Sequence, residues 1–291
     1  MMEGADISFV HLGIVIQHLQ NHISLFGFQI TYYGIIIGAG MLAGIWIAQS
    51  DAKRRGQDPE LYLDFALYGI IFSIAGARIY YVVFEWDYYK ENLFQIFNLR
   101  AGGLAIYGGV IAAVLTLITY TRIKKASFFS MADTGVLGLI TGQIIGRWGN
   151  FFNCEAFGGY TDNLFAMRIK RSLVSESMLN QDVLNHLLVE NGIQYIQVHP
   201  TFLYESLWNV CLLCFMLWYR KRKKFEGELL WIYLLGYGTG RFWIEGLRTD
   251  QLKLFHTNIP VSQVLSLLLV LVAAIVLLFR CKRQNQTTKG E

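Results

Sequence analysis

The sequence predicts an all-α polytopic membrane protein with seven transmembrane helices and a small extracytoplasmic cap. Of its 291 residues, 54% are hydrophobic and only 16% are charged, against roughly 25% charged residues in a soluble globular domain. Too few charged side chains are present to cover the surface of a soluble protein of this size. This composition excludes a disordered chain and a coiled coil, and it disfavours an ordinary soluble enzyme.

Seven segments contain the roughly 20 mostly apolar residues that a membrane-spanning helix requires. Runs of this length in lipid satisfy their backbone hydrogen bonds as helices. The expected spans are Thr31–Ser50, Phe65–Phe84, Gly102–Thr121, Ala132–Phe152, Phe202–Tyr219, Glu228–Leu247 and Val261–Phe279. The chain then divides into an outer interfacial segment (1–30), helices 1–4 (31–152), the cap (153–201), helices 5–7 (202–279) and a cytoplasmic basic tail (280–291).

Two of these regions lie outside the expected spans on the outer side. Residues 1–30 are expected to form an interfacial helix followed by a tight turn near Leu25 and Gly27. Residues 153–201 are too few for an independent core, so they are expected to pack on the helix bundle.

The basic residues predict the direction of the helices. Fifteen Lys and Arg residues lie on one set of alternate connections and seven on the other set. Because cytoplasmic loops carry the excess of basic residues, the N-terminus is expected outside and the C-terminus in the cytoplasm.

Three arginines lie inside expected spans, at Arg78, Arg147 and Arg241. With about 1.5 Å of rise per residue, each lies roughly 8–9 Å below the outer membrane edge. An arginine in the bilayer costs from about 3 to more than 10 kcal/mol, so three at one depth indicate a function.

Other polar residues fall in the same layer, namely Tyr33, Tyr107, Asn150, Asn153, Glu155, Glu205, Tyr237 and Glu245. One interpretation is a structural network of ion pairs, such as Arg241 with Glu245 or Arg147 with Glu155. The other is an anionic-lipid site in which the three arginines surround one headgroup, because guanidinium groups bind phosphate through two hydrogen bonds. The number of polar residues at one depth favours the lipid site.

No metal site and no nucleic-acid partner are expected. The four cysteines lack the company of other metal-ligating residues, and the net charge of +4 is spread over several loops.

Five motifs in chain order resemble those of the prolipoprotein diacylglyceryl transferase family. Residues 146–158 (GRWGNFFNCEAFG) resemble the family signature G-R-x-G-N-F-x-N-x-E-x-x-G. The other matches are YYG at 32–34, GARIYYV at 76–82, HPTFLYE at 199–205 and GYGTGRFWIE at 236–245, with Arg248 following.

The resemblance implies transfer of the sn-1,2-diacylglyceryl group from phosphatidylglycerol to the lipobox cysteine of a bacterial prolipoprotein, the first step of lipoprotein maturation. It implies a protein of the bacterial cytoplasmic membrane whose active site faces the outer leaflet, without a metal or soluble cofactor. The implied catalytic residues are Arg147, Arg241 and Tyr107, and the implied phosphatidylglycerol-binding residues are Arg147, Asn150, Asn153, Tyr33 and Arg241. The implied supporting residues are Arg78, Glu155, His199, Glu205, Tyr237, Glu245 and Arg248.

One position departs from the family pattern. The family usually has His-Gly-Gly where this chain has Tyr107-Gly108-Gly109, so the identity of the general base stays open. Two other functions also stay open: an anion transporter or channel, and a lipid-binding scaffold without catalysis.

Overall fold

The computed structural model describes residues 6–25, 27–99, 102–254 and 259–287. Arg100 and the two ends of the chain, at 1–5 and 288–291, lie outside the described residues. The chain forms two compact units, one made of residues 1–44 and 136–291 and the other of residues 45–135.

Each of the seven expected spans coincides with a long helix. The helices are α1 (Tyr32–Arg54), α2 (Glu60–Phe84), α4 (Ile106–Ile123), α5 (Phe128–Phe152), α7 (Thr201–Tyr219), α8 (Glu228–Glu245) and α9 (Val261–Thr287). In the described part of the chain, six of them are long and apolar enough to cross a membrane. The exception is α8, which carries three charged residues, Glu228, Arg241 and Glu245. The expected multi-pass membrane protein is therefore confirmed, and the count of seven spans stays a prediction. The all-α class is wrong, because the mostly helical chain also forms two β-sheets.

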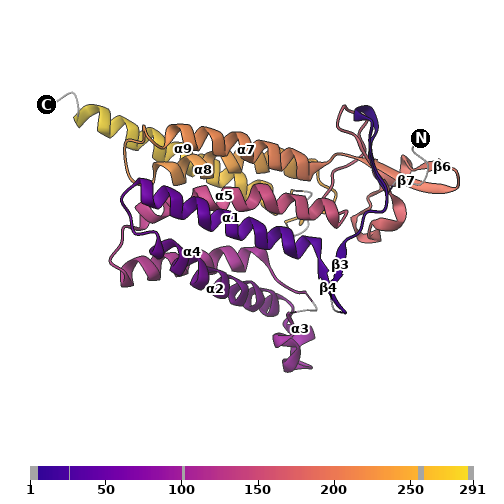
Figure 1. Ribbon diagram of the computed structural model, residues 1–291, viewed down its shortest axis with the longest axis horizontal. Helices are drawn as coiled ribbons and strands as arrows, with labels where there is room; N and C mark the ends of the chain where they lie inside the picture. The colour runs from indigo at the N-terminus through magenta and orange to yellow at the C-terminus, as the bar shows by residue number, and fades with distance from the viewer. Residues whose placement is uncertain (1–5, 26, 100–101, 255–258, 288–291) are drawn as a thin grey trace. The chain divides into compact units, whose positions relative to one another are not determined.

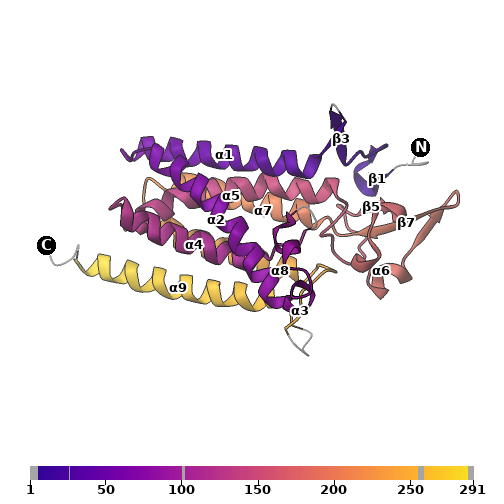
Figure 2. The ribbon, with the colours of Figure 1, turned by 90° about the horizontal axis from the view of Figure 1, so that it is seen from below.

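A five-stranded antiparallel sheet lies beyond the long helices of the first unit, where α5 ends and α7 begins (Figures 1 and 2). The strands are β1 (Ile7–Phe9), β2 (Ile14–Ile16), β5 (Met167–Lys170), β6 (Leu188–Glu190) and β7 (Ile193–Val198), in the order β2-β1-β5-β7-β6. The central register pairs Ile169 with Ile7 and with Ile196. These three isoleucines join Phe151 of α5 and Phe202 of α7 in one buried cluster, which anchors the sheet to both helix ends.

The expected N-terminal interfacial helix is wrong. The segment instead forms β1, a short 3-10 turn (η1, Val10–Leu12), β2, and a hairpin of β3 (His22–Leu25) with β4 (Phe28–Thr31). β-Branched residues such as Ile7 and Ile14 favour strands, and β5 offers β1 a pairing partner more than 150 residues away. The expected tight turn is present, since Leu25 pairs with Phe28 and Gly27 has φ +84°.

In the first unit, α7 packs against α8 and α8 against α9 (Figure 1). Ser206 of α7 donates a hydrogen bond to the carbonyl of Ile144 in α5, at 3.1 Å. Trp208 of α7 donates through Nε1 to the carbonyl of Gly236 in α8, at 2.9 Å. These bonds fix the heights of α5 and α8 relative to α7.

In the second unit, α2 packs closely against α4. A Cβ atom at Gly76 would lie 2.4 Å from the Cβ of Ala112, so only glycine permits this approach. The helix α3 (Trp86–Tyr89) and the 3-10 helix η2 (Leu93–Phe97) lie between α2 and α4 in the chain. The remaining short elements belong to the first unit: α6 (Gln181–Asn185), η4 (Arg171–Leu173) and η5 (Glu176–Met178).

Candidate functional site

Backbone hydrogen bonds join the ends of α5, α7 and α8. The amide of Gly158, six residues after α5, donates to the carbonyl of His199 at 2.9 Å, and the amide of His199 donates to Gly159 at 3.1 Å. The amide of Gly159 donates to the carbonyl of Leu247, two residues after α8, at 2.9 Å. A Cβ atom at Gly158 would lie 2.7 Å from the Cβ of His199, so glycine is required here. This backbone clamp brings the polar ends of three helices together.

A buried carboxylate lies among these helices. Glu205 of α7 is only 4% exposed, and its two oxygens bind different arginines. Its Oε2 lies 2.6 Å from a terminal nitrogen of Arg147 on α5, and its Oε1 lies 2.8 Å from a terminal nitrogen of Arg241 on α8. One carboxylate therefore fixes both guanidinium groups, whose side chains remain 20% and 17% exposed.

The network extends along α8 and past its end. The other terminal nitrogen of Arg241 lies 2.5 Å from Glu245, which is the pairing considered in the structural interpretation. A terminal nitrogen of Arg248 lies 3.9 Å from Glu205. Arg248 also donates two hydrogen bonds to Asp250, at 2.9 and 2.7 Å. Three arginines thus lie among three carboxylates, and the cluster is close to electrically balanced.

Asp250 was not expected at the site. Desolvation opposes ionisation of Asp250, but the hydrogen bonds and positive charge of Arg248 outweigh it and lower the pKa of the carboxyl group. Burial alone would lower the pKa of Arg248, yet Asp250 and the nearby glutamates raise it. Both groups are therefore charged at neutral pH. A carboxylate two residues after a predicted site arginine is the sequence signal that could have identified Asp250.

The asparagines of the signature bind Glu155. Asn150 and Asn153 donate side-chain hydrogen bonds to Glu155 Oε1, at 2.9 and 3.3 Å. Arg147 forms its ion pair with Glu205, and Glu155 instead accepts hydrogen bonds from the two asparagines. The pairing of Arg147 with Glu155 that the sequence suggested is therefore not the one formed. Tyr33 lies against the same turn of α5, where a Cβ atom at Gly149 would lie 2.8 Å from its ring.

His199 belongs to a separate polar group at the start of α7. Its Nδ1 lies 3.3 Å from the hydroxyl of Tyr204 and 3.4 Å from the side-chain nitrogen of Asn163, which itself donates to Tyr204 at 3.0 Å. Burial lowers the pKa of His199, so its imidazole is neutral at neutral pH. Asn163 was missed because nothing in the local sequence distinguishes it from other loop asparagines.

Arg78 has a different role from Arg147 and Arg241. Its five N–H groups donate to the carbonyls of five residues in and after η2, at 2.6 to 3.2 Å; these are Gln95, Ile96, Asn98, Gly102 and Gly103. No donor remains for a phosphate, so the expectation that Arg78 shares a headgroup with the other two arginines is wrong. The third arginine beside Glu205 is Arg248.

The other two predicted residues are Tyr107 and Tyr237. Tyr107 is the second residue of α4 in the second unit and is half-buried. Tyr237 lies one helical turn before Arg241 on α8, and its ring stacks on Tyr233 with centroids 5.4 Å apart.

Fold and site together define a class: a multi-pass membrane protein with partly exposed arginines fixed on a buried carboxylate, suited to an anionic group within the lipid layer. A family model described as prolipoprotein diacylglyceryl transferase matches residues 20–279. This chain belongs to that family.

Curated relatives from several bacteria carry the name phosphatidylglycerol–prolipoprotein diacylglyceryl transferase. The protein of Bacillus cytotoxicus is 41% identical over 271 residues, covering 93% of this chain and 95% of the relative. That of Clostridioides difficile is 41% identical, covering 92% and 98%. That of Listeria welshimeri is 42% identical, covering 88% of each.

Proposed function

We propose that this protein transfers the sn-1,2-diacylglyceryl group of phosphatidylglycerol to the lipobox cysteine thiol of a prolipoprotein. A thioether forms and glycerol phosphate is released. Family membership and the names of the relatives support the reaction and both substrates. The observation that carries the proposal is the bridging of Arg147 and Arg241 by Glu205, because it fixes two cations around one position.

The two arginines bind the lipid phosphate. Arg147 contacts Glu205 through one terminal nitrogen, Arg241 contacts Glu205 and Glu245 through its two terminal nitrogens, and both side chains stay partly exposed. The planar fork of arginine matches two phosphate oxygens, and such charge-assisted bonds are roughly twice as strong as neutral ones. The other lipid-binding residues are Asn150 in the last turn of α5, Asn153 just after α5, and Tyr33 in the first turn of α1.

The reaction needs no nucleophile from the protein, because the acceptor supplies its thiol. The thiolate attacks the glyceryl carbon, an S–C bond forms, and the C–O bond to the phosphate breaks. The electron pair stays on the leaving phosphate oxygen, where negative charge grows. Arg147 and Arg241 stabilise that charge, and removing one such donor typically costs about 10²- to 10³-fold in kcat.

Removal of the thiol proton contributes less to the barrier than departure of the phosphate. A free thiol has a pKa of about 8.5, so a few per cent is already thiolate at neutral pH, and nearby cations increase that fraction. In this scheme the proton passes to bulk water, and Tyr107 relays it directly or through an intervening water. Catalysis then depends mainly on the arginines and only secondarily on Tyr107.

We also propose that all seven long helices cross the bilayer, with the N-terminus outside and the site towards the outer leaflet. The asymmetry of basic residues supports this direction. Phosphatidylglycerol then enters sideways from the outer leaflet, and the acceptor cysteine approaches at the same depth. Single cysteines placed in the sheet region should react with a membrane-impermeant thiol reagent on intact cells.

The decisive experiment incubates purified protein with phosphatidylglycerol and a lipobox peptide and scores the diacylglyceryl mass gain of the peptide. A peptide with serine in place of cysteine is the matched control. Lipid binding without a thioether product would indicate a scaffold. Anion flux in reconstituted vesicles without a product would indicate a transporter. Either result would contradict the proposal.

A further inference from the structure

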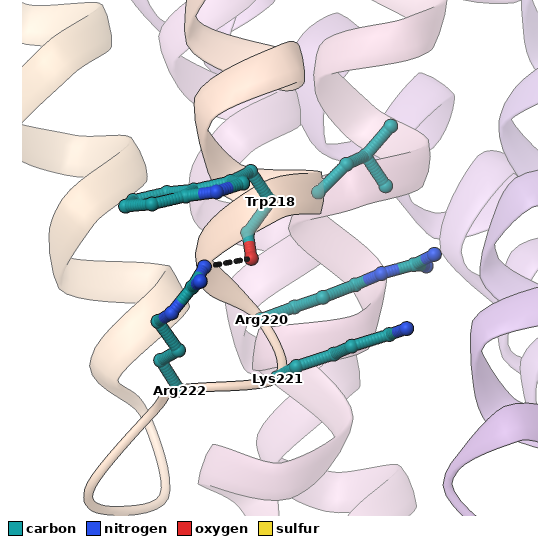
Figure 3. Close-up of a pocket in the computed structure, with 5 residues that line it drawn as sticks. Trp218, Arg220, Lys221 and Arg222 are labelled. Atoms are coloured by element: carbon teal, nitrogen blue, oxygen red, sulfur yellow. Dashed lines mark hydrogen bonds between the residues drawn. The ribbon is translucent and has the colours of Figure 1, made fainter.

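The connection between α7 and α8 carries five consecutive basic residues, 220–224. It starts at the C-terminal end of α7, 14 residues after Glu205, which corresponds to roughly 21 Å along the helix. A pocket of about 490 Å³ opens there, lined by Leu217, Trp218, Arg220, Lys221 and Arg222 (Figure 3). This basic pocket is separate from the arginine cluster of the proposed active site.

The backbone around the basic pocket is fixed by buried and interhelical bonds. Glu228 of α8 is 1% exposed, and its carboxylate accepts hydrogen bonds from the hydroxyl of Tyr219 at 2.7 Å and from the backbone amide of Lys224. Gln284 of α9 donates to the carbonyl of Lys224 at 2.7 Å. The loop is therefore held from both neighbouring helices, and the pocket is formed before any ligand arrives.

The side chains of Lys221 and Arg222 are exposed. The guanidinium carbon of Arg222 lies 4.2 Å from the centroid of the Trp218 ring, a cation–π contact that orients it. The side chains of Arg220 and Lys221 extend in one direction from the loop (Figure 3). In the part of the chain that the structure describes, neither Lys221 nor Arg222 has a carboxylate partner.

Apolar surface adjoins these charges. Leu217 and Trp218 line the pocket, and Trp218 and Phe215 on the last turns of α7 are exposed. Tryptophan at the end of a membrane span typically lies at headgroup level. A ligand that fits both parts of the pocket carries a phosphate and a hydrocarbon chain.

We propose that the basic pocket binds the headgroup phosphate of an anionic phospholipid, whose acyl chains lie along the exposed apolar face of α7. Basic residues beside a membrane span contribute about 1 kcal/mol each to attraction for anionic lipid, or about fivefold in affinity. Occupancy of the basic pocket does not depend on the reaction at Arg147 and Arg241, so this proposal can be tested independently of the transferase reaction.

The test measures lipid binding by the delipidated full-length protein in detergent, by native mass spectrometry. The probes are phosphatidylserine, phosphatidylcholine with the same acyl chains, and inorganic phosphate alone. The test variant is Lys221→Gln/Arg222→Gln. The control variant is Lys53→Gln/Arg122→Gln, which removes two exposed charges from the last turns of α1 and α4. Equal melting temperatures of the variants establish that both are folded.

We expect the test variant to bind phosphatidylserine about 30-fold more weakly than the parent, with the control variant within about threefold of the parent. Phosphatidylcholine should bind weakly to all three proteins. The proposal is overturned if both variants lose equal affinity, if phosphatidylcholine binds the parent as well as phosphatidylserine does, or if inorganic phosphate alone binds as tightly as the lipid.

Discussion

Replacing Glu205 by glutamine tests whether the shared carboxylate positions the two arginines. The substitution keeps the size of the side chain but removes its charge. The carboxylate oxygens now lie 2.6 Å from Arg147 and 2.8 Å from Arg241, and in the variant an NH₂ group faces one of these two guanidinium groups. Breaking a buried ion pair by removing one partner costs about 3–5 kcal/mol. Because both arginines keep some exposure, we expect the lower end, about 3 kcal/mol.

The effect on the reaction should separate kcat from KM. A misplacement of about 1 Å at a reacting centre can cost 10²-fold in rate, so we expect kcat to fall about 100-fold. The cluster of three arginines and three carboxylates gains one net positive charge in Glu205→Gln, so KM for phosphatidylglycerol should stay the same or fall. The assay is peptide mass gain at varied phosphatidylglycerol, with melting temperature measured in parallel.

The matched control is Glu190→Gln, in which the lost carboxylate pairs with Arg168 on the sheet, at 2.7 Å. It should leave both kinetic constants unchanged. If Glu205→Gln kept the parent kcat, or raised KM alone, the carboxylate would not position the arginines and the reasoning would be refuted.

Four further substitutions test the site and the structure around it. Arg147→Ala should abolish measurable transfer, whereas Tyr107→Phe should keep measurable activity; equal loss in the same peptide assay would contradict the ranking. Arg78→Gln should lower the melting temperature by several degrees, because loop carbonyls lose charge-assisted bonds, and an unchanged melting curve would remove its structural role. The pKa of Asp250 lies below its unfolded value of about 3.9, so its stabilisation is present above that pH and is lost as pH falls through the folded pKa. Asp250→Asn should flatten the fall in thermal stability below about pH 4, and a curve parallel to that of the parent would refute the linkage to Arg248.

The helices were predictable because long apolar runs determine them locally. The fifth span, expected at Phe202–Tyr219, is observed at Thr201–Tyr219. The sheet was not predictable in this way, because β1 contains three residues and pairs with a strand more than 150 residues later. No local pattern specifies such a pairing, and the apolar residues around it were consistent with an interfacial helix.

At the site, the predicted depth of each residue in the membrane identified which residues take part, but it did not identify which residues pair with one another. Arg147, Glu205 and Arg241 were all placed in one layer, and they do form one network. The sequence nonetheless suggested Glu155 for Arg147, because Glu155 is nearer along the chain. Arg78 lies in the same predicted layer, but a loop folds its carbonyls around it, and sequence depth carries no information about that loop.

The backbone clamp between Gly158, His199 and Leu247 limits how far insertions in the neighbouring loops can disturb the helix ends. Main-chain atoms, not side chains, tie the three helix ends together. Strands β5 and β7 pack on Phe151 and Phe202 beside this clamp, so a change in length confined to the turn between β6 and β7 should leave the spacing of Arg147 and Arg241 intact. The length of that turn and the geometry of the arginine cluster can thus vary separately.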